Sequence, residues 1–234
     1  MLKLTGVGKI FGARVVLKNV TLETAPGTVC LLVGANGAGK TTLLRIMAGL
    51  AKPSAGKVEW HCEPGELGYL GHATFIYPGL TALENLAFWS RLHGLGADRS
   101  RLLDMLERVE LVRFAEERAG TFSRGMAQRL NLARILIQSP RILLLDEPGT
   151  GLDMYSISLL HREIDKARTE GASVVWISHD LAGDMPHADR VLAIVNKTLA
   201  YDGSPAGWPG LEALAPTACS NGTTSSACTG GSPC

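Results

Sequence analysis

The sequence has no long hydrophobic run. Its longest uninterrupted apolar stretches, such as Val29–Val33 and Val191–Val195, are five residues long. A helix that crosses a bilayer needs about 20 apolar residues, so we expect no direct membrane span. The first residues lead directly into a polar, glycine-containing stretch. Because no apolar segment follows a charged start, we predict no secretory signal.

An excess of charge of either sign is also missing. Lys and Arg total 23 and Asp and Glu total 22, which gives a formal net charge of +1. Proteins that bind mainly to a nucleic-acid backbone usually carry a strong basic excess, so we expect no nucleic-acid partner. The five cysteines form an odd, scattered set. Such a set does not indicate a disulfide framework.

The sequence does contain short apolar runs that alternate with longer helical patterns. Hydrophobic residues make up 46% of the chain and charged residues 19%, a composition typical of a folded protein. The alternation predicts an α/β protein with a largely parallel sheet. The first three of the predicted strands lead directly into polar loops, where an open α/β sheet places its ligands. The predicted buried strands are Val29–Val33, Ile142–Leu145, Val174–Ile177 and Val191–Val195.

Strand signals vanish between residues 81 and 139, and helix signals replace them. Thr81 and Glu84 have the spacing of a capping box, which predicts a helix start, and Gly94 marks the end of that helix. Further helices are predicted over about residues 101–112 and 123–139. A helical insert, at about residues 75–139, therefore interrupts the α/β core.

The end of the chain differs in composition from the rest. From Pro216 onward the residues are mainly Ser, Thr, Gly, Ala and Cys. Such a segment cannot bury enough apolar surface to offset its ordering entropy. We therefore expect one folded domain over residues 1–215 and a disordered tail over residues 216–234.

A complete phosphate-binding motif, G-x-x-x-x-G-K-[ST], follows the first predicted strand. Its glycines let backbone N–H groups converge on phosphate oxygens, and the next helix adds the positive end of its dipole. Lys40 is expected to bridge the β- and γ-phosphates, and the Thr41 hydroxyl suits Mg²⁺. A glycine-rich turn before an ordinary helix is the alternative, but a chance match in such a chain is on the order of 1%. The predicted nucleotide-binding residues are Gly34, Ala35, Asn36, Gly37, Ala38, Gly39, Lys40, Thr41 and Thr42.

Two adjacent carboxylates follow the strand predicted at Ile142–Leu145. Asp146 can hold Mg²⁺, directly or through water, and Glu147 can polarise a water that attacks the γ-phosphate. Alone, this pattern fits an acidic turn equally well. Beside a phosphate loop, we expect Asp146 to bind the metal and Glu147 to be catalytic.

Further motifs follow in an order that resembles the ATP-binding-cassette (ABC) ATPase family. Ser123-Arg124-Gly125-Met126 resembles the family's signature motif, usually written L-S-G-G-Q. Pro148–Asp153 resembles the stretch from Walker B to the D-loop, and His179 is similar to the switch histidine. Phe11 falls where the family stacks an aromatic ring on adenine. The resemblance covers about residues 1–205.

This resemblance implies a P-loop NTPase fold with a mostly parallel sheet core, an N-terminal antiparallel β region and a helical insert. It implies an ATPase with ATP and Mg²⁺ as cofactors, in which Glu147, His179 and Lys40 are catalytic. Two copies would form a head-to-tail homodimer, with each ATP held between the phosphate loop of one copy and the signature loop of the other. Ser123 is an N-cap type of residue, so its helix offers a second anion site. The resemblance adds as nucleotide contacts Phe11, His72, Ser123, Arg124, Gly125, Met126 and Asp153.

The resemblance also implies a partner in the membrane. The family works with separate integral membrane transporter subunits. Such subunits would hold this chain at the cytoplasmic face of the cell membrane, as a peripheral protein.

The chain departs from the family pattern at three positions. Arg124 replaces the first signature glycine, and Met126 replaces the usual glutamine. We expect the Arg124 side chain to point into solvent; the alternative is that it strengthens the clamp on ATP. His72 stands where most of the family carries the Q-loop glutamine. We expect it to contact the nucleotide site, and the alternative is a polar loop histidine without a ligand.

The segment from Leu70 to Gly94 is similar to one branch of the family, the ATP-binding subunit of the haem exporter of cytochrome c maturation. This resemblance implies haem export or cytochrome c biogenesis. One alternative is an exporter ATPase for drugs, lipids or polysaccharide. Another, from a different class, is a soluble ABC ATPase outside transport. The near-neutral charge and the lack of coiled-coil or zinc insertions count against the last.

Apolar and aromatic residues gather between His72 and the signature motif. We expect at least half of them to pack in the core of the helical insert. The others are expected to form a groove that receives a helix of the membrane partner, as the resemblance implies. These residues are Phe75, Ile76, Tyr77, Phe88 and Trp89. Four histidines without motif context are expected at the surface, namely His61, His93, His161 and His187.

Overall fold

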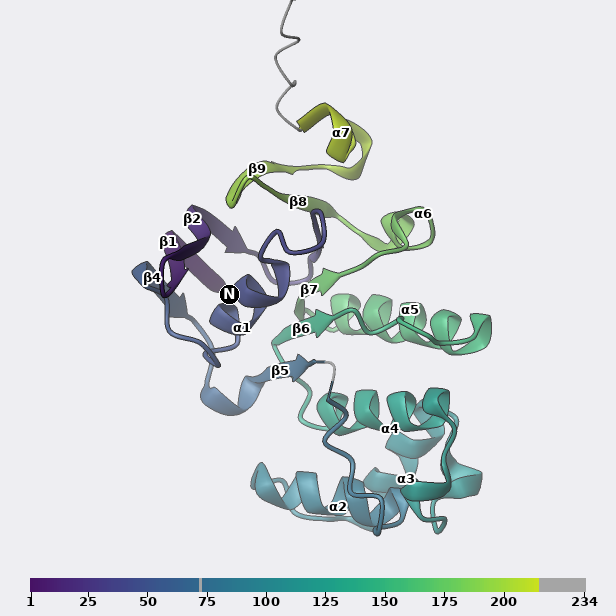
Figure 1. Cartoon of the computed structure of the whole chain (residues 1–234). Helices are drawn as coiled ribbons and strands as arrows, with labels where there is room; N and C mark the ends of the chain where they lie inside the picture. The colour runs from purple at the N-terminus through teal and green to yellow at the C-terminus, as the bar shows by residue number, and fades with distance from the viewer. Residues whose placement is uncertain (72, 215–234) are drawn as a thin grey trace, which may run out of the picture.

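A mixed six-stranded sheet forms the centre of the fold (Figure 1). The computed structural model describes residues 1–71 and 73–214. The strand order in this sheet is β5-β6-β7-β3-β8-β9. Strands from β5 to β8 pair in parallel, and β9 pairs antiparallel with β8. The strands are β3 (Val29–Val33), β5 (Leu67–Leu70), β6 (Ile142–Asp146), β7 (Ser173–Ile177), β8 (Arg190–Val195) and β9 (Thr198–Gly203).

The predicted α/β fold with a mostly parallel sheet is confirmed. All four strands expected from apolar runs are present, three of them longer by one residue than predicted. Sequence reasoning missed β5 and β9, the two edge strands. Both have partly exposed side chains, so neither forms a continuous apolar run.

A second, antiparallel sheet comes from the N-terminal part of the chain. Its order is β2-β1-β4, and β1 pairs antiparallel with both neighbours. The N-terminal antiparallel region that the family resemblance implied is therefore present. The strands are β1 (Leu2–Phe11), β2 (Arg14–Thr24) and β4 (Ala55–Trp60).

Different helices pack on the two faces of the large sheet. α1 (Lys40–Met47) packs between the two sheets (Figure 1), where Cys30 and Leu32 of β3 share its apolar cluster. Leu31 of the same strand faces the other way, toward α5 (Met154–Thr169) and α4 (Arg124–Leu136). Successive side chains of a strand point to opposite faces, so one short apolar run contributes to two cores.

A helical insert forms a third apolar cluster from α2 (Ala82–Leu92), α3 (Arg99–Arg108) and one face of α4. The predicted capping box is confirmed, because Thr81 Oγ1 accepts from the Glu84 backbone N–H and Glu84 accepts from that of Thr81. Gly94, with φ 71°, follows the helix as predicted. α3 ends earlier than expected, since Glu110 has a left-handed backbone with φ 59° that cannot continue a helix.

The remaining helices are short. They are α6 (Leu181–Asp184) and α7 (Leu211–Leu214), with 3-10 turns at Pro64–Glu66, Val112–Phe114, Ala119–Thr121, Met185–His187 and Pro205–Gly207. No helix within residues 1–71 and 73–214 has the length and hydropathy that a bilayer crossing requires. The tail at residues 216–234 lies outside the described residues, so its disorder stays a prediction.

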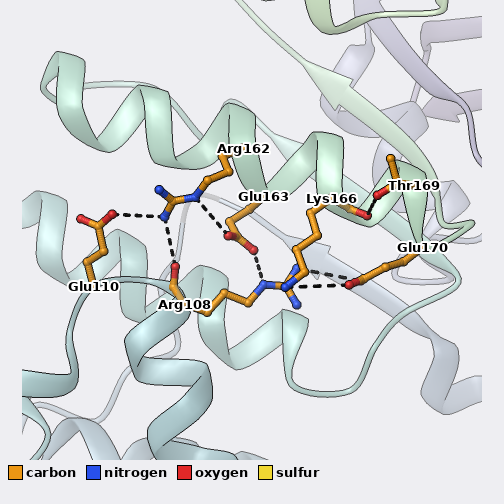
Figure 2. Close-up of polar contacts among 7 residues, drawn as sticks. All are labelled: Arg108, Glu110, Arg162, Glu163, Lys166, Thr169 and Glu170. Atoms are coloured by element: carbon orange, nitrogen blue, oxygen red, sulfur yellow. Dashed lines mark hydrogen bonds and ion pairs between the residues drawn. The ribbon is translucent and has the colours of Figure 1, made fainter.

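Charged side chains join the end of α3 to α5 (Figure 2). Arg108 forms an ion pair with Glu163 of α5, whose side chain is 2% exposed. Arg162 Nη2 donates to the Arg108 carbonyl oxygen at 3.3 Å and to Glu110 Oε1 at 3.2 Å. Arg108 Nη2 also lies 3.9 Å from Glu170 Oε2. A buried charge is costly unless it is paired, so this network fixes the insert against α5.

We expect Arg108→Met to destabilise the protein by about 3–5 kcal/mol, because buried Glu163 loses its main counter-charge. For a domain of this size that is a fall in Tm of roughly 6–20 °C. Arg99→Met is a matched control in the same helix, α3. It removes the ion pair of Arg99 with Glu116, whose two side chains are 65% and 66% exposed. Exposed pairs contribute about 0–1 kcal/mol. Equal Tm values for the two variants would contradict the stabilising role of the buried pair.

Candidate functional site

The carboxyl ends of β3, β7 and β6 lie side by side at one edge of the large sheet. Leu32 of β3 pairs with Ile177 of β7, and Ile177 pairs with Asp146 of β6. The loops that follow these strands therefore start next to one another, where α/β sheets bind ligands. These loops carry the phosphate motif, Glu147 directly after Asp146, and the Ser178-His179 pair.

Two glycines let the phosphate loop pass close to its neighbours. A Cβ at Gly34 would lie 2.6 Å from the Ile194 carbonyl oxygen. Gly39 has φ 104°, and a Cβ there would lie 2.9 Å from Leu17 Cδ2. Gly39 also precedes α1 without any side-chain cap. The backbone N–H groups of the first turn are therefore open to phosphate oxygens.

The Lys40 side chain folds over this loop. Its Nζ donates to the carbonyl oxygens of Gly34, at 2.7 Å, and Ala35, at 3.2 Å. The residue is only 7% exposed. Burial lowers the pKa of Lys40, although the carboxylates of Glu147 and Asp146 oppose this shift. A partly desolvated ammonium attracts an anion more strongly than an exposed one does.

Thr41 and Asp146 form a pair of oxygen ligands. Thr41 Oγ1 donates to Asp146 Oδ1 at 3.0 Å, and the Tyr69 hydroxyl donates to Asp146 Oδ2 at 3.4 Å. Burial, followed by the Asp146 carboxylate, raises the pKa of Tyr69 to about 12, so this phenol stays a donor at neutral pH. Mg²⁺ is usually bound by one or two carboxylates together with substrate phosphates and water. The pair fits such a site; no larger cluster of metal-ligating side chains occurs in the described part of the chain.

Glu147 and His179 meet across the loops that follow β6 and β7. His179 Nε2 lies 2.6 Å from Glu147 Oε1. Glu147 has a left-handed backbone with φ 54°, and its N–H donates to the Ile177 carbonyl oxygen at 3.1 Å. Such a conformation is uncommon outside glycine and clusters at functional sites. The carboxylate and imidazole together can polarise a water and donate a hydrogen bond to a phosphate oxygen.

A cavity of about 380 Å³ lies over the phosphate loop. Phe11, which is 55% exposed, forms part of its wall. Sequence reasoning missed two further wall residues, Arg14 and Val16. The hairpin between β1 and β2 places both beside Phe11, so recognising that hairpin in the sequence would have found them. The predicted residues that line the cavity are Phe11, Asn36, Gly37, Gly39, Lys40, Thr41, Thr42 and Glu147. Gly34, Ala35 and Ala38 belong to the same loop, where the Ala38 N–H donates to the Ala35 carbonyl oxygen at 3.0 Å.

The predicted signature residues are not among the residues that line this cavity. Ser123 Oγ caps α4 by accepting from the Met126 N–H at 3.2 Å. Asp153 caps α5 in the same way, accepting from the Ser156 N–H at 2.7 Å. Hydrogen bonds from the backbone and side chain of Ser156 lower the pKa of Asp153. One copy of the chain thus presents the two predicted halves of a nucleotide site at separate places.

We expected the Arg124 side chain to point into solvent, but the structure shows it held against the protein. Although the residue is exposed, its Nη2 donates to the Thr150 carbonyl oxygen at 2.8 Å. A Cβ at Gly151 would lie 2.5 Å from Arg124 Cζ, so the guanidinium packs directly on that glycine. Gln128, to which sequence reasoning assigned no role, adds a second link through Nε2 to the Pro148 carbonyl oxygen at 3.2 Å. Both side chains tie α4 to the segment that leads into α5.

Two histidines expected at the surface are instead largely buried. The side chains of His161 and His187 are 14% and 26% exposed, and they bond to Asp184 and Asp165. The prediction was wrong because each histidine is paired with an aspartate more than 20 residues away in the chain. His72 lies outside the described residues, so its contact with the nucleotide site stays a prediction.

The aromatic residues before and in α2 are mostly exposed, which corrects the expectation that at least half pack in the core. Phe75, Tyr77 and Phe88 are 55%, 45% and 39% exposed, whereas Ile76 packs against the core of the insert. The rings contact one another instead, with 4.9 Å between the centres of Tyr77 and Phe88. Arg134 lies 4.8 Å from the Trp89 ring.

A larger cavity, of about 930 Å³, is lined by Thr41 and Asp146. These two residues are the pair of oxygen ligands described above, so the cavity borders the proposed metal site. Exposed apolar side chains form much of the rest of the wall, including Leu50, Trp60 and Phe75. Such an exposed apolar surface is typical of a binding site for another molecule.

A family model described as "ABC transporter" matches residues 17–150. This match covers more than half of the chain and includes the phosphate loop and the Asp146-Glu147 pair. The chain belongs to this family. It is thus an ATP-binding subunit of the ABC transporter type and an ATPase.

Two curated relatives are equally similar in sequence. The zinc import ATP-binding protein ZnuC of Halorhodospira halophila is 37% identical over 209 residues, or 88% of this chain and 78% of that protein. The cytochrome c biogenesis ATP-binding export protein CcmA of Methylococcus capsulatus is 37% identical over 191 residues, or 76% of this chain and 92% of that protein. Sequence similarity therefore does not favour a haem exporter over a transporter of another substrate.

A solved structure supports the fold class. It is the dimeric ATP-binding cassette MJ0796 in a post-hydrolysis state, bound to ADP and inorganic phosphate. The TM-score is 0.78 and the identity 27%, over 89% of this chain and 100% of that chain. The P-loop NTPase fold of the ABC ATPase type, which the sequence motifs predicted, is confirmed.

Proposed function

We propose that two copies of this chain close head to tail on ATP and drive a separate membrane partner when the ATP is hydrolysed. The observation that carries this proposal is the meeting of Thr41 with Asp146 and of Glu147 with His179 at one sheet edge. The phosphate loop and Glu147 border one cavity, since Lys40 and Glu147 both line it.

Lys40, the loop amides and the first turn of α1 bind the phosphates, and Phe11 packs on the base. Thr41 and Asp146 hold Mg²⁺, which supplies charge neutralisation at the phosphate oxygens. Glu147 accepts a proton from the attacking water, and His179 donates a hydrogen bond to the γ-phosphate. His179 is accessible for this contact, because its side chain is 47% exposed and lies beside Glu147.

The second half of each site comes from the other copy. Ser123, Arg124, Gly125 and Met126 begin α4, and backbone N–H groups at a helix start attract phosphate oxygens. Because these residues lie outside the cavity of their own chain, a symmetric pair would build two identical composite sites. Asp153 then stands near the interface at the start of α5.

We expect Glu147→Gln to keep ATP binding, to lose most hydrolysis, by roughly 10²-fold or more, and to accumulate the ATP-bound dimer. The amide cannot accept the proton, but it leaves Lys40, Thr41 and Asp146 in place. Phosphate release and size-exclusion chromatography with ATP and Mg²⁺ measure both effects. Glu84→Gln is a control on an exposed carboxylate of the insert. An unchanged turnover rate in Glu147→Gln would remove Glu147 from the proposed role.

The membrane partner binds the 930 Å³ cavity in this proposal. Its exposed apolar wall suits an apolar segment of another protein. Thr41 and Asp146 lie at the inner wall, so an inserted segment would sense whether the metal and nucleotide are bound. The chain would work at the cytoplasmic face of the membrane, where ATP is available.

We expect Leu50→Glu to weaken membrane association, because it puts a charge into the apolar wall. Leu50 is 59% exposed, so the protein should still fold and bind ATP. Leu92→Glu is a matched control, since Leu92 is 62% exposed and lies outside this cavity. The measurement is the fraction of each variant that sediments with membrane vesicles from the native organism. Equal loss in both variants would contradict the assignment of the cavity.

For the cargo, we propose the haem-export branch. The support is the resemblance of residues 70–94 and the similarity to CcmA. Deletion of the gene in its native organism should abolish covalently haem-bound c-type cytochromes, seen by haem staining after denaturing electrophoresis. Normal cytochromes c, together with poor growth when zinc is scarce, would instead favour an import role like that in the name of ZnuC.

A further inference from the structure

A polar chain connects the loop that carries His179 to α5. His161 projects from the middle of α5, and its side chain is 14% exposed. Its ring packs beside Trp176 of β7, with 5.5 Å between the ring centres. Its Nε2 lies 2.7 Å from Asp184 Oδ1. The imidazole is thus anchored on one side by an aromatic ring and on the other by a carboxylate.

Asp184 passes this contact on to the residue that precedes His179. Asp184 is 6% exposed, and its Oδ2 forms a hydrogen bond with Ser178 Oγ. Ser178 Oγ also accepts from the Asp180 N–H at 3.0 Å. The two oxygens of one carboxylate therefore hold α5 and the loop at residues 178–180 at the same time.

The directions of these hydrogen bonds follow from the donor inventory. A carboxylate only accepts, so Ser178 Oγ–H donates to Asp184 and His161 donates through Nε2–H. Ser178 Oγ is then free to accept from Asp180, as observed. The relay runs from His161 to Asp184 to Ser178 and is satisfied at each of these atoms. Satisfied buried networks of this kind rigidify the groups that they join.

One small cavity borders both the relay and the hydrolytic pair. It measures about 160 Å³. Glu147 and His179 line it together with His161, Ser178 and Asp184. A shift of the relay therefore moves a wall that the hydrolytic pair shares.

We propose that His161 is a positioning residue for ATP hydrolysis, because through Asp184 and Ser178 it holds the 178–180 loop where His179 meets Glu147. The proposal rests on the proposed role of His179. His161 touches neither nucleotide nor metal in this account; it fixes the backbone of the residue that does. Since Asp153 caps the start of α5, beside the proposed dimer interface, the relay also couples that interface to the His179 loop.

The test is a set of steady-state ATPase measurements on the full chain with ATP and Mg²⁺. His161→Leu removes the Nε2 donor but keeps an apolar side chain against Trp176. We expect kcat to fall about ten- to hundredfold, the range produced by misplacing a catalytic group by about 1 Å. KM for ATP should stay within about twofold, because no relay residue lines the cavity over the phosphate loop.

Rescue separates positioning from packing. His161→Gln carries an amide N–H that reaches Asp184, so we expect it to restore most of the turnover that His161→Leu loses. Ser178→Ala cuts the same relay at its other end. If one relay carries the effect, the double variant His161→Leu/Ser178→Ala should be no slower than the slower single variant, since the two losses are coupled.

His187→Gln is the matched control. His187 comes from the segment after α6, contacts the His161 ring at 4.1 Å between centres and bonds to Asp165 of α5 at 2.8 Å. It is a neighbouring His–Asp pair with no bond to the 178–180 loop among the described contacts. We expect its kcat to match that of the unmodified chain.

Three results would overturn the proposal. These are unchanged turnover in His161→Leu, additive losses in the double variant, or equal losses in His161→Leu and His161→Gln. Failure of the proposed function itself is distinguishable, because Glu147→Gln would then keep the turnover rate of the unmodified chain.

Discussion

The register of three adjacent parallel strands is the constraint on which the site depends. Leu32, Ile177 and Asp146 pair across β3, β7 and β6, so three loops begin at one level of one sheet edge. A slip of one residue would turn every side chain of a strand to the opposite face. The buried alternation along β3 prevents such a slip, because its side chains fill two different cores. Core packing thereby brings the phosphate loop, two carboxylates and a histidine together.

α5 connects this sheet edge to the rest of the molecule. Its start is capped by Asp153, its middle carries His161, and Glu163 pairs with Arg108 of the insert. α4 is tied to the same region through Arg124 and Gln128. The insert is therefore joined to the site through ion pairs and hydrogen bonds at separate positions along one helix. A separate protein bound beside the insert has a physical route to the nucleotide.

Sequence reasoning found the fold and the phosphate cradle because both depend on local patterns. Apolar runs mark the buried strands, and the motif ending in Lys40-Thr41 follows one of them directly. Contacts between distant segments were not predictable in the same way. The bond from Arg124 to Thr150 and that from His161 to Asp184 each join segments more than 20 residues apart. Neither residue belongs to a pattern that states its partner, so both were assigned to the surface.

The central claim is that each nucleotide is shared by two copies of the chain, and mixing two defective chains tests it most directly. Lys40→Ala loses the cradle and Ser123→Glu repels phosphate at the signature helix, each combined with Glu147→Gln to prevent turnover. Neither chain alone should form an ATP-dependent dimer. Their mixture should form a dimer that holds one ATP, because one cradle and one signature remain intact on opposite copies. A mixture that stays monomeric with ATP and Mg²⁺ would contradict the account.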